Sequence, residues 1–271
     1  MYDLIVIGLG PAGMNACIYA KEAGLNVLGI EKETPGGLLL KDFKINNYLG
    51  FKEINSSDLA LKMFEHFNSF NIPYKKENVM EIVNQDNIEI KTNNNSYLTK
   101  NLLITAGIKR KNIKNLDKFI GQGVSYCTVC DAALYKDKDV LVISNSLDDV
   151  NYLKDIVNNL YFIHTENKDM NINNQIFTDY QNIEKQENKF IINNEIQVDG
   201  IFINIGTENT VDFDKNLNIR NEKGFIEVDK NMQTKEKHIY AAGDVIEKDL
   251  RQICTATAEA AIAVNHIKRE K

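Results

Sequence analysis

Apolar residues along the chain fall into two alternating patterns, short continuous runs and stripes at helical spacing. The continuous runs have the character of strands buried in a parallel sheet, and they lie at 4–7, 26–30, 102–106, 139–143 and 239–242. The stripes predict helices after residue 11, over about 57–70 and from about 252 to 268. This alternation predicts an α/β fold.

The segment between the second and third of these runs is expected to leave the parallel sheet. Strands are predicted near 79–83, 86–92 and 96–99, and Asn93-Asn94-Asn95 predicts a hairpin turn. We therefore expect an antiparallel excursion, after which the chain returns to the parallel sheet at Leu102.

A glycine-rich turn follows the first apolar run directly. Gly8, Gly10 and Gly13 lie between that predicted strand and a helix with alanines on one face. Glycines let the backbone turn tightly and approach a pyrophosphate, whose charge is stabilised by the N–H groups at the start of the helix. The next strand ends at Glu31, 23 residues after Gly8, where an acidic side chain is expected to accept hydrogen bonds from an adenosine ribose. The constellation predicts a dinucleotide site rather than a tight turn alone.

Later motifs favour a flavin nucleotide. Gly36-Gly37 follows the ribose-binding position, and the last buried strand ends in Gly243-Asp244. Asp244 is expected to bind a ribityl hydroxyl, with the next helix N-terminus directed at the pyrimidine side of a flavin, where negative charge appears on reduction. The alternative is that Asp244 only caps that helix.

Because the flavin motifs lie near both ends of the chain, the flavin domain is expected to be discontinuous. Residues 1–112 and 236–271 form the predicted FAD-binding domain, and residues 113–235 form an inserted domain. The insert contains the strand at 139–143, which resembles the opening of a second dinucleotide-binding unit.

Two cysteines three positions apart, Cys127 and Cys130, lie in the inserted domain. Such a pair can close a small strained disulfide, and a thiolate in such a pair attacks other disulfides readily. Asp131 follows directly and is a candidate general acid or base beside the thiols. The competing interpretation is structural zinc, but zinc needs four ligands, and Cys17 and Cys254 are isolated and far away in sequence. We favour a redox dithiol.

Composition narrows the class of protein. The chain has 271 residues, of which 43% are hydrophobic and 26% charged, and it is long enough for two domains. No apolar run approaches the ~20 residues of a membrane helix. The first strand begins almost at Met1, which leaves no room for a signal peptide, so we expect a cytoplasmic location. In a reducing compartment a C-x-x-C pair is catalytic more often than structural.

The net charge of −6 is unevenly distributed along the chain. Residues 113–235 hold 13 Lys and Arg against 20 Asp and Glu, a net charge of −7, and the flanking segments together carry +1. No basic stripe with interleaved aromatic residues is present, so nucleic acid is not an expected partner.

Taken in order, the motifs resemble the low-molecular-weight thioredoxin reductases over essentially the whole chain. They are the glycine turn at 8–13, Gly36-Gly37, the loop at 46–50, Thr105-Ala106-Gly107, the cysteine motif at 127–131, the strand end at 241–244 and Arg251-Gln252. The resemblance implies that Cys130 is the flavin-proximal sulfur, that Cys127 attacks thioredoxin and that Asp131 is the proton donor. It also implies a homodimer.

The same resemblance implies a set of FAD-binding residues, each taken from a motif of the flavin domain. They are Gly8, Gly10, Pro11, Ala12, Gly13, Glu31, Lys32, Gly36, Gly37, Leu38, Asn47, Ala106, Gly107, Gly243, Asp244, Arg251, Gln252 and Ile253. No metal site is expected.

The inserted domain departs from the family at its nucleotide turn. The turn reads Ser144-Asn145-Ser146-Leu147-Asp148-Asp149, without glycine, and its two carboxylates are expected to repel a phosphate. The double arginine that would bind the 2′-phosphate of NADPH is absent after the strand that ends at His164, a residue we interpret as structural. The predicted fold class is therefore α/β with two dinucleotide-binding, Rossmann-like domains, the second inserted in the first and its nucleotide site degenerate.

This combination resembles the ferredoxin-dependent flavin thioredoxin reductases of anaerobes such as clostridia. We expect electrons to pass from reduced ferredoxin through FAD and the Cys127-Cys130 dithiol to thioredoxin. Three alternatives stay open: an NADPH-dependent thioredoxin reductase, a flavin reductase of another disulfide, and a redox sensor without turnover. Ferredoxins are usually acidic, so docking is expected on the near-neutral flavin domain, at Lys109, Arg110 and Lys111.

Overall fold

The structure is a computed structural model. It describes residues 1–41, 43–111, 113, 115–165, 182–208 and 213–270, with the backbone alone for Arg110, Cys130, Thr207 and Glu208. The chain divides into two compact units. The first consists of Met1–Lys109 and Asn209–Lys271, and the second is Arg110–Glu208.

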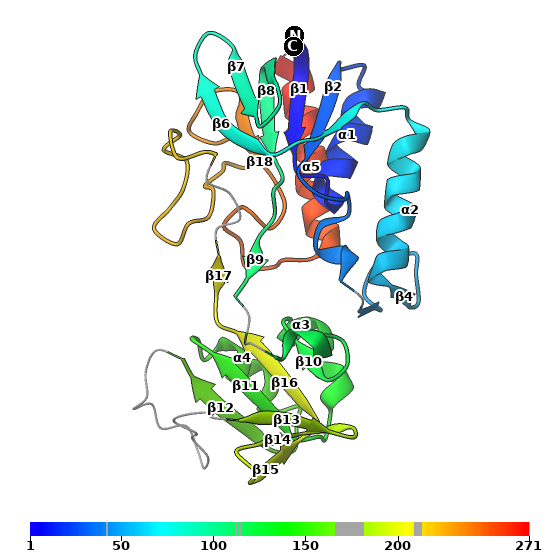
Figure 1. The fold of residues 1–271 in the computed structure, drawn as a ribbon, viewed down its shortest axis with the longest axis vertical. Coiled ribbons are helices and arrows are strands. Elements are labelled where there is room, and N and C mark those ends of the chain that lie inside the picture. The colour runs from blue at the N-terminus through cyan, green and yellow to red at the C-terminus, as the bar shows by residue number, and fades with distance from the viewer. Residues whose placement is uncertain (42, 112, 114, 166–181, 209–212, 271) are drawn as a thin grey trace. The chain divides into compact units, whose positions relative to one another are not determined.

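The described part of the first unit contains a seven-stranded sheet (Figure 1). Its strands are β1 (Tyr2–Ile7), β2 (Val27–Glu31), β5 (Tyr74–Lys76), β6 (Val79–Asn84), β7 (Ile88–Thr92), β8 (Ser96–Ile104) and β18 (Ile239–Ala241). The order is β5-β2-β1-β8-β7-β6, and β18 also pairs with β8. Strands β5, β2, β1, β8 and β18 run parallel, so their carboxyl ends lie along one edge of the sheet.

Strand β8 joins the parallel and antiparallel parts of this sheet. Residues 96–99 pair antiparallel with β7, and residues 99–104 pair parallel with β1. The sequence predicted two strands here, with a break between them. The structure has one strand because the polar residues at the expected break are bonded to β1: Lys100 Nζ and the Asn101 side-chain amide each lie 3.1 Å from an Asp3 oxygen.

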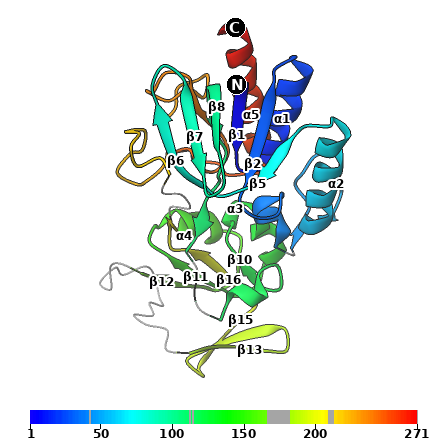
Figure 2. The same cartoon turned by 45° about the horizontal axis from the view of Figure 1, so that its top comes forward.

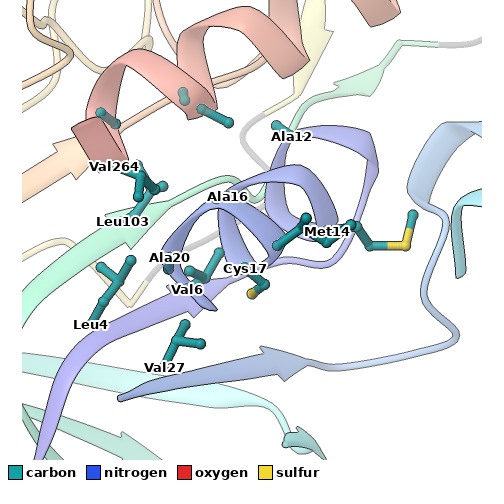
Figure 3. Packing of buried hydrophobic residues seen from close by; sticks show 14 of the residues in the cluster. Leu4, Val6, Ala12, Met14, Ala16, Cys17, Ala20, Val27, Leu103 and Val264 are labelled. Atoms are coloured by element: carbon teal, nitrogen blue, oxygen red, sulfur yellow. The ribbon is translucent and has the colours of Figure 1, made fainter. Parts of the chain in front are cut away.

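Alternate residues of β1 face two different cores. Leu4 and Val6 pack against the helices α1 (Pro11–Glu22) and α5 (Ile253–Glu270), and Figure 3 shows Ala16 of α1 in this cluster. Ile5 and Ile7 pack in a second core with residues of β6 and β7. The buried parallel strand predicted at 4–7 is confirmed, and its two faces are covered by different parts of the chain.

Residues 213–235 belong to the first unit, which corrects the predicted second boundary. Phe213, Ile219 and Ile226 lie in the same core as Ile5 and Ile7. The side chain of Asp214, 2% exposed, forms an ion pair of 2.7 Å with Arg220. The insert therefore ends at 208 rather than at 235, because the apolar residues after 212 are buried against the flavin sheet.

A peripheral layer of the first unit follows β2. It comprises the short 3₁₀ helix η1 (Gly37–Leu40), the strands β3 (Lys44–Ile45) and β4 (Ile54–Asn55), and the helix α2 (Ser56–Ser69). Leu39, Ile45 and Leu59 form a small core that joins these elements. Of the helices in the described ranges, none has the length and apolar character needed to cross a membrane.

The second unit, as far as it is described, contains a four-stranded parallel sheet of order β10-β16-β11-β12. Its elements are β10 (Val124–Ser125), α3 (Thr128–Asp131), η3 (Ala132–Tyr135), β11 (Val140–Ser144), α4 (Asp148–Leu153), β12 (Leu160–His164) and β16 (Gly200–Asn204). Figure 2 shows β10, β16 and β11 together. A separate antiparallel sheet comprises β13 (Ile183–Gln186), β14 (Lys189–Ile192) and β15 (Ile196–Val198), which the sequence analysis did not predict.

The two segments that connect the units are short strands, β9 (Lys109–Arg110) and β17 (Thr207–Glu208), which pair with each other. Lys109 ends the first unit, whereas Arg110 and Lys111 begin the second. The three basic residues expected to receive ferredoxin on the flavin domain are therefore connector residues, and only the first belongs to that domain.

Candidate functional site

The glycine turn after β1 is held between two neighbouring strands. Gly8 has a φ of 93°, which side chains disfavour, and its N–H donates to the Ile30 carbonyl at 2.8 Å. A Cβ on Gly8 would lie 2.7 Å from the carbonyl oxygen of Thr105, and a Cβ on Gly13 would lie 1.8 Å from that of Gly8. The close approach of α1 to the strand ends therefore requires glycine at both positions.

Gly10 differs from its two neighbours in the motif. Its φ is an ordinary −74°, and it directly precedes Pro11 at the start of α1, where no side chain caps the helix. A Cβ on Gly10 would meet nothing closer than the Gly37 Cα, at 4.0 Å, and a Cβ on Gly37 would lie 3.4 Å from the Gly10 Cα. Packing within the protein does not require glycine at Gly10. Together, this space and the uncapped N–H groups of α1 fit a pyrophosphate.

Glu31 lies at the end of β2, beside this turn. Its Oε2 accepts a hydrogen bond from the Leu9 N–H at 2.7 Å, and its Oε1 accepts one from the Glu33 N–H at 3.1 Å. The Leu9 carbonyl in turn accepts the Gly36 N–H at 2.8 Å. The structure thus brings Glu31 and Gly36 to the glycine turn, with Lys32 exposed beside them, while the ribose contact of Glu31 stays a prediction.

The loop after β18 reaches the start of α1. Gly243 has a φ of 83°, and a Cβ there would lie 3.1 Å from the Cβ of Ala12. The Gly243 N–H donates to Glu259 Oε2 at 2.9 Å. Lys248 Nζ donates to the same carboxylate oxygen at 2.7 Å and lies 3.7 Å from Asp244 Oδ1. Asp244 therefore lies next to an ion pair between Lys248 and Glu259, which the sequence analysis did not identify.

Arg251 supports this loop. Its guanidinium donates to the carbonyls of Lys248 at 2.8 Å, Ile246 at 3.1 Å and Asp244 at 3.4 Å, and it lies 4.3 Å above the centre of the Phe225 ring. Burial lowers the pKa of the Arg251 guanidinium, against the opposing effect of neighbouring carboxylates. These contacts assign Arg251 to holding the loop, whereas its predicted contact with the cofactor stays a prediction.

The remaining predicted cofactor residues lie on the same elements. The Asn47 amide donates to Gln252 Oε1 at 3.1 Å, which joins the loop at 46–50 to the residue before Ile253, where α5 begins. Leu38 lies in η1, and Ala106 and Gly107 follow β8.

Thr105 is a residue whose role the sequence analysis missed. Its side chain is buried, and Oγ1 lies 2.7 Å from the Gly8 carbonyl and 3.0 Å from the Ile7 carbonyl. It fixes the glycine turn to the end of β8. The residue stood in a quoted motif, but nothing in the pattern shows that a hydroxyl there contacts a turn 97 positions earlier.

In the second unit, Cys127 lies between β10 and α3. It is disulfide-bonded, whereas Cys17 and Cys254 are free. Its N–H donates to Ser125 Oγ at 3.0 Å, and its carbonyl accepts the Asp131 N–H at 3.2 Å. The side chain of Cys130 lies outside the described residues.

The other two thiols differ in their surroundings. Cys17 is fully buried in α1 (Figure 3), and burial raises the pKa of its thiol, whereas Cys254 is exposed on α5. Within the described ranges, no group of three or more His, Cys, Asp or Glu side chains could hold a metal ion.

The charge of Asp131 acts on the phenol of Tyr135. Asp131 is half-buried at the end of α3. Burial raises the pKa of Tyr135 to about 12, and the charges of Asp131 and Asp199 add to this effect. The Tyr135 phenol therefore stays protonated near the predicted proton donor at neutral pH.

The turn at 144–149 is bonded to itself. The Ser146 N–H donates to Ser144 Oγ at 3.1 Å, the Asp148 N–H donates to Ser146 Oγ at 3.2 Å, and Ser146 Oγ donates to Asp148 Oδ2 at 2.7 Å. The helix that follows, α4, has six residues. His164, at the end of β12, packs edge-on against Phe162.

Comparisons with known proteins cover both units. A family model described as pyridine nucleotide-disulphide oxidoreductase matches residues 2–147 and 160–260. A thioredoxin reductase of Bacillus subtilis (strain 168) is 32% identical, over 99% of this chain and 94% of that protein. The solved thioredoxin reductase of Streptococcus pyogenes MGAS5005 is 31% identical with a TM-score of 0.90, covering 99% of this chain and 97% of that chain. A ferredoxin-flavin thioredoxin reductase from Clostridium acetobutylicum is 27% identical with a TM-score of 0.59, covering 99% and 97% respectively.

The predicted fold class is confirmed by these structures and by the two sheets described above. The matched residues include the glycine turn, the cysteine motif and the loop after β18. The chain therefore belongs to the pyridine nucleotide-disulphide oxidoreductase family, as a flavoprotein disulfide oxidoreductase of the thioredoxin reductase type.

Proposed function

We propose that this chain reduces the disulfide of thioredoxin with electrons from reduced ferredoxin, through FAD and the Cys127-Cys130 dithiol. The observation that carries the choice of donor is the turn at 144–149, where hydroxyl oxygens of the turn accept the N–H groups of Ser146 and Asp148. A nucleotide-binding turn needs such N–H groups for its phosphates.

Two further features of the turn act against NADPH, and the helix that begins in it is short. It has no glycine, so side chains occupy the space in which a backbone approaches pyrophosphate. The carboxylates of Asp148 and Asp149 repel a phosphate. The helix after the turn has six residues, half the length of α1 after the flavin-domain turn. The turn at Gly10 thus has space for a pyrophosphate, whereas the N–H groups of the turn at 144–149 are bonded to side chains of that turn.

The residues that would hold FAD are those of the first unit. The space beside Gly10 and Gly37 would receive the pyrophosphate, Glu31 the adenosine ribose and Asp244 a ribityl hydroxyl. A bound flavin accepts single electrons from an iron–sulfur protein and delivers a pair to a disulfide.

The dithiol performs the exchange with thioredoxin. Reduction of the Cys127-Cys130 bond takes up two electrons and two protons and gives two thiols. The Cys127 thiolate attacks the thioredoxin disulfide, forms a mixed disulfide and releases one thioredoxin thiolate. The Cys130 thiolate then attacks the Cys127 sulfur, which closes the original disulfide and releases the second thiolate. Asp131 donates the proton that a leaving thiolate requires.

The relatives support thioredoxin as the substrate more than they support ferredoxin as the electron donor. The proteins from B. subtilis and S. pyogenes carry the name thioredoxin reductase, and the one from C. acetobutylicum is a ferredoxin-flavin thioredoxin reductase. Sequence identities of 31% and 27% to the two solved structures do not separate the donors, so the donor rests on the turn. The homodimer is part of the proposal by resemblance alone.

The test follows the flavin absorbance of the purified protein without oxygen. Millimolar NADPH or NADH should leave the flavin oxidised, and reduced ferredoxin should bleach it and support repeated reduction of thioredoxin. Dithionite serves as the positive control for a reducible flavin. Rapid bleaching by NADPH or NADH would refute the donor assignment. Bleaching by ferredoxin without thioredoxin turnover would instead point to a sensor or to another disulfide substrate.

A further inference from the structure

One carboxylate in the second unit accepts hydrogen bonds from three separate elements. Asp149 Oδ1 accepts the Thr128 hydroxyl at 2.5 Å, and Asp149 Oδ2 accepts the Ser144 hydroxyl at 3.1 Å and the Asn204 amide at 2.9 Å. Thr128 follows Cys127 directly and begins α3. The last residue of the degenerate nucleotide turn is thus bonded to the cysteine motif.

The two residues on the sheet side of Asp149 are held by backbone pairing. Ser144 and Asn204 are the final residues of β11 and β16, and they are paired directly in the parallel sheet. Ser144 is fully buried, and Thr128 is 7% exposed. Hydrogen bonds to an ionised carboxylate are among the stronger ones, and low exposure strengthens them further. Asp149 Oδ2 is therefore bonded to the sheet, through Ser144 and Asn204. Asp149 Oδ1 is bonded to α3, through Thr128.

The helix α3 needs such support because it is only four residues long. A helix of one turn gains little from its own backbone bonds and takes its position from tertiary contacts. A disulfide requires a narrow range of separations between its two Cα atoms. The bond from Thr128 to Asp149 fixes the first residue of α3, so it limits how far the backbone next to Cys127 can move.

We propose that Asp149 is a positioning residue for the Cys127-Cys130 dithiol and acts through the hydroxyl of Thr128. The turn that would hold pyrophosphate in a nucleotide domain serves here as the anchor of the redox helix. This inference rests on the proposed role of the dithiol and is independent of the electron donor. The inference predicts that the hydrogen bond from Thr128 to Asp149 favours the disulfide over the dithiol. Cys127 is disulfide-bonded in this structure.

The experiment measures the dithiol–disulfide equilibrium of the flavin-loaded protein in glutathione buffers of graded ratio. Thr128→Val removes the hydroxyl at nearly constant size, and Asp149→Asn removes the charge that accepts it. Each should shift the equilibrium about tenfold toward the dithiol, as expected for the loss of a hydrogen bond to a charged group. Tenfold corresponds to a reduction potential about 30 mV higher.

Two matched variants should leave the equilibrium within about twofold of the parent, well below the tenfold step of a hydrogen bond to a charge. Thr128→Ser keeps the hydroxyl. Asp148→Asn makes the same charge change one position away, on an exposed side chain bonded to Ser146 within the turn. The double variant Thr128→Val with Asp149→Asn should shift the equilibrium no further than either single change, because both remove one interaction.

A parent-like potential in both Thr128→Val and Asp149→Asn would overturn the inference, as would an equal shift in Asp148→Asn. Asn204→Ala covers the case in which these proteins do not fold, because Asn204 is exposed. It should give a smaller shift in the same direction, and no shift would overturn the inference. Thioredoxin reduction by a Cys127→Ser protein would instead refute the role of the dithiol, and the inference with it.

Discussion

Replacing Gly10 with alanine separates what the fold requires from what the cofactor requires. The added Cβ has 4.0 Å of clearance from its nearest neighbour, and the φ of −74° suits alanine. Gly→Ala at a compatible position stabilises a protein by about 0.4–1 kcal/mol, because the unfolded chain loses freedom. The apoprotein should therefore melt at the same temperature or slightly higher.

FAD binding should respond in the opposite direction. The methyl group would occupy the space beside Gly37 in which we place the pyrophosphate. Crowding by one extra methyl group costs about 1–3 kcal/mol in a closely packed site. At 1.4 kcal/mol per factor of ten, the dissociation constant of FAD should rise about 5- to 150-fold.

The assay combines equilibrium dialysis of FAD with thermal unfolding of the apoprotein, and Gly13→Ala is the control. A Cβ on Gly13 would lie 1.8 Å from the Gly8 carbonyl oxygen, so this change should lower the apoprotein melting temperature as well as FAD affinity. An unchanged dissociation constant in Gly10→Ala would show that the pyrophosphate does not lie at this turn. A loss of apoprotein stability in Gly10→Ala would show that the space beside Gly10 is not open.

Three further changes test other parts of the molecule. Cys130→Ser should trap a stable mixed disulfide with thioredoxin and Cys127→Ser should not, because only the first keeps the attacking thiol and lacks the resolving one. Non-reducing gels show the adduct, and trapping by Cys127→Ser would reverse the roles of the two cysteines. Reversing the charges of Lys109 and Lys111 should slow flavin reduction by ferredoxin several-fold at low ionic strength and only slightly at about 0.5 M salt. Stopped-flow absorbance measures this rate, and an effect independent of salt would exclude electrostatic docking at these residues. Arg220→Met leaves a buried carboxylate unpaired and should lower the free energy of unfolding of the first unit by about 3–5 kcal/mol. Urea unfolding followed by flavin release measures this, and unchanged flavin release would contradict the placement of residues after 212 in that unit.

Local patterns predicted the elements around the glycine turn closely. The runs at 4–7 and 26–30 became β1 and β2, and the stripes at 57–70 and 252–268 became α2 and α5 to within two residues. These elements were predictable because the apolar runs, the helical stripes and the glycines between them all indicate the same order of strand, turn and helix. The same agreement located Glu31, whose carboxylate accepts the Leu9 N–H, and Gly36, whose N–H donates to the Leu9 carbonyl.

The features that escaped prediction depend on contacts between distant residues. Ile219 and Ile226 lie in no long apolar run, so nothing local shows that they cover the flavin sheet. The contacts of Thr105 with Gly8, and of Glu259 with Gly243, join side chains to backbone groups that only the folded chain brings together. The sequence showed that the turn at 144–149 lacks glycine, but not that Asp149 would accept a bond from Thr128.

The rate at which the buried thiol of Cys17 reacts with a labelling reagent measures how often the flavin domain opens. It lies within the core that joins α1 to β1, so a labelling reagent reaches it only when that core opens. Cys254 is exposed and should react at once, and Cys127, which is disulfide-bonded, does not react with thiol reagents. The slow phase of labelling therefore reports the opening frequency of the first unit alone. Added FAD should lengthen that phase by a factor of one plus the ratio of the free FAD concentration to its Kd, since the cofactor binds only the closed core.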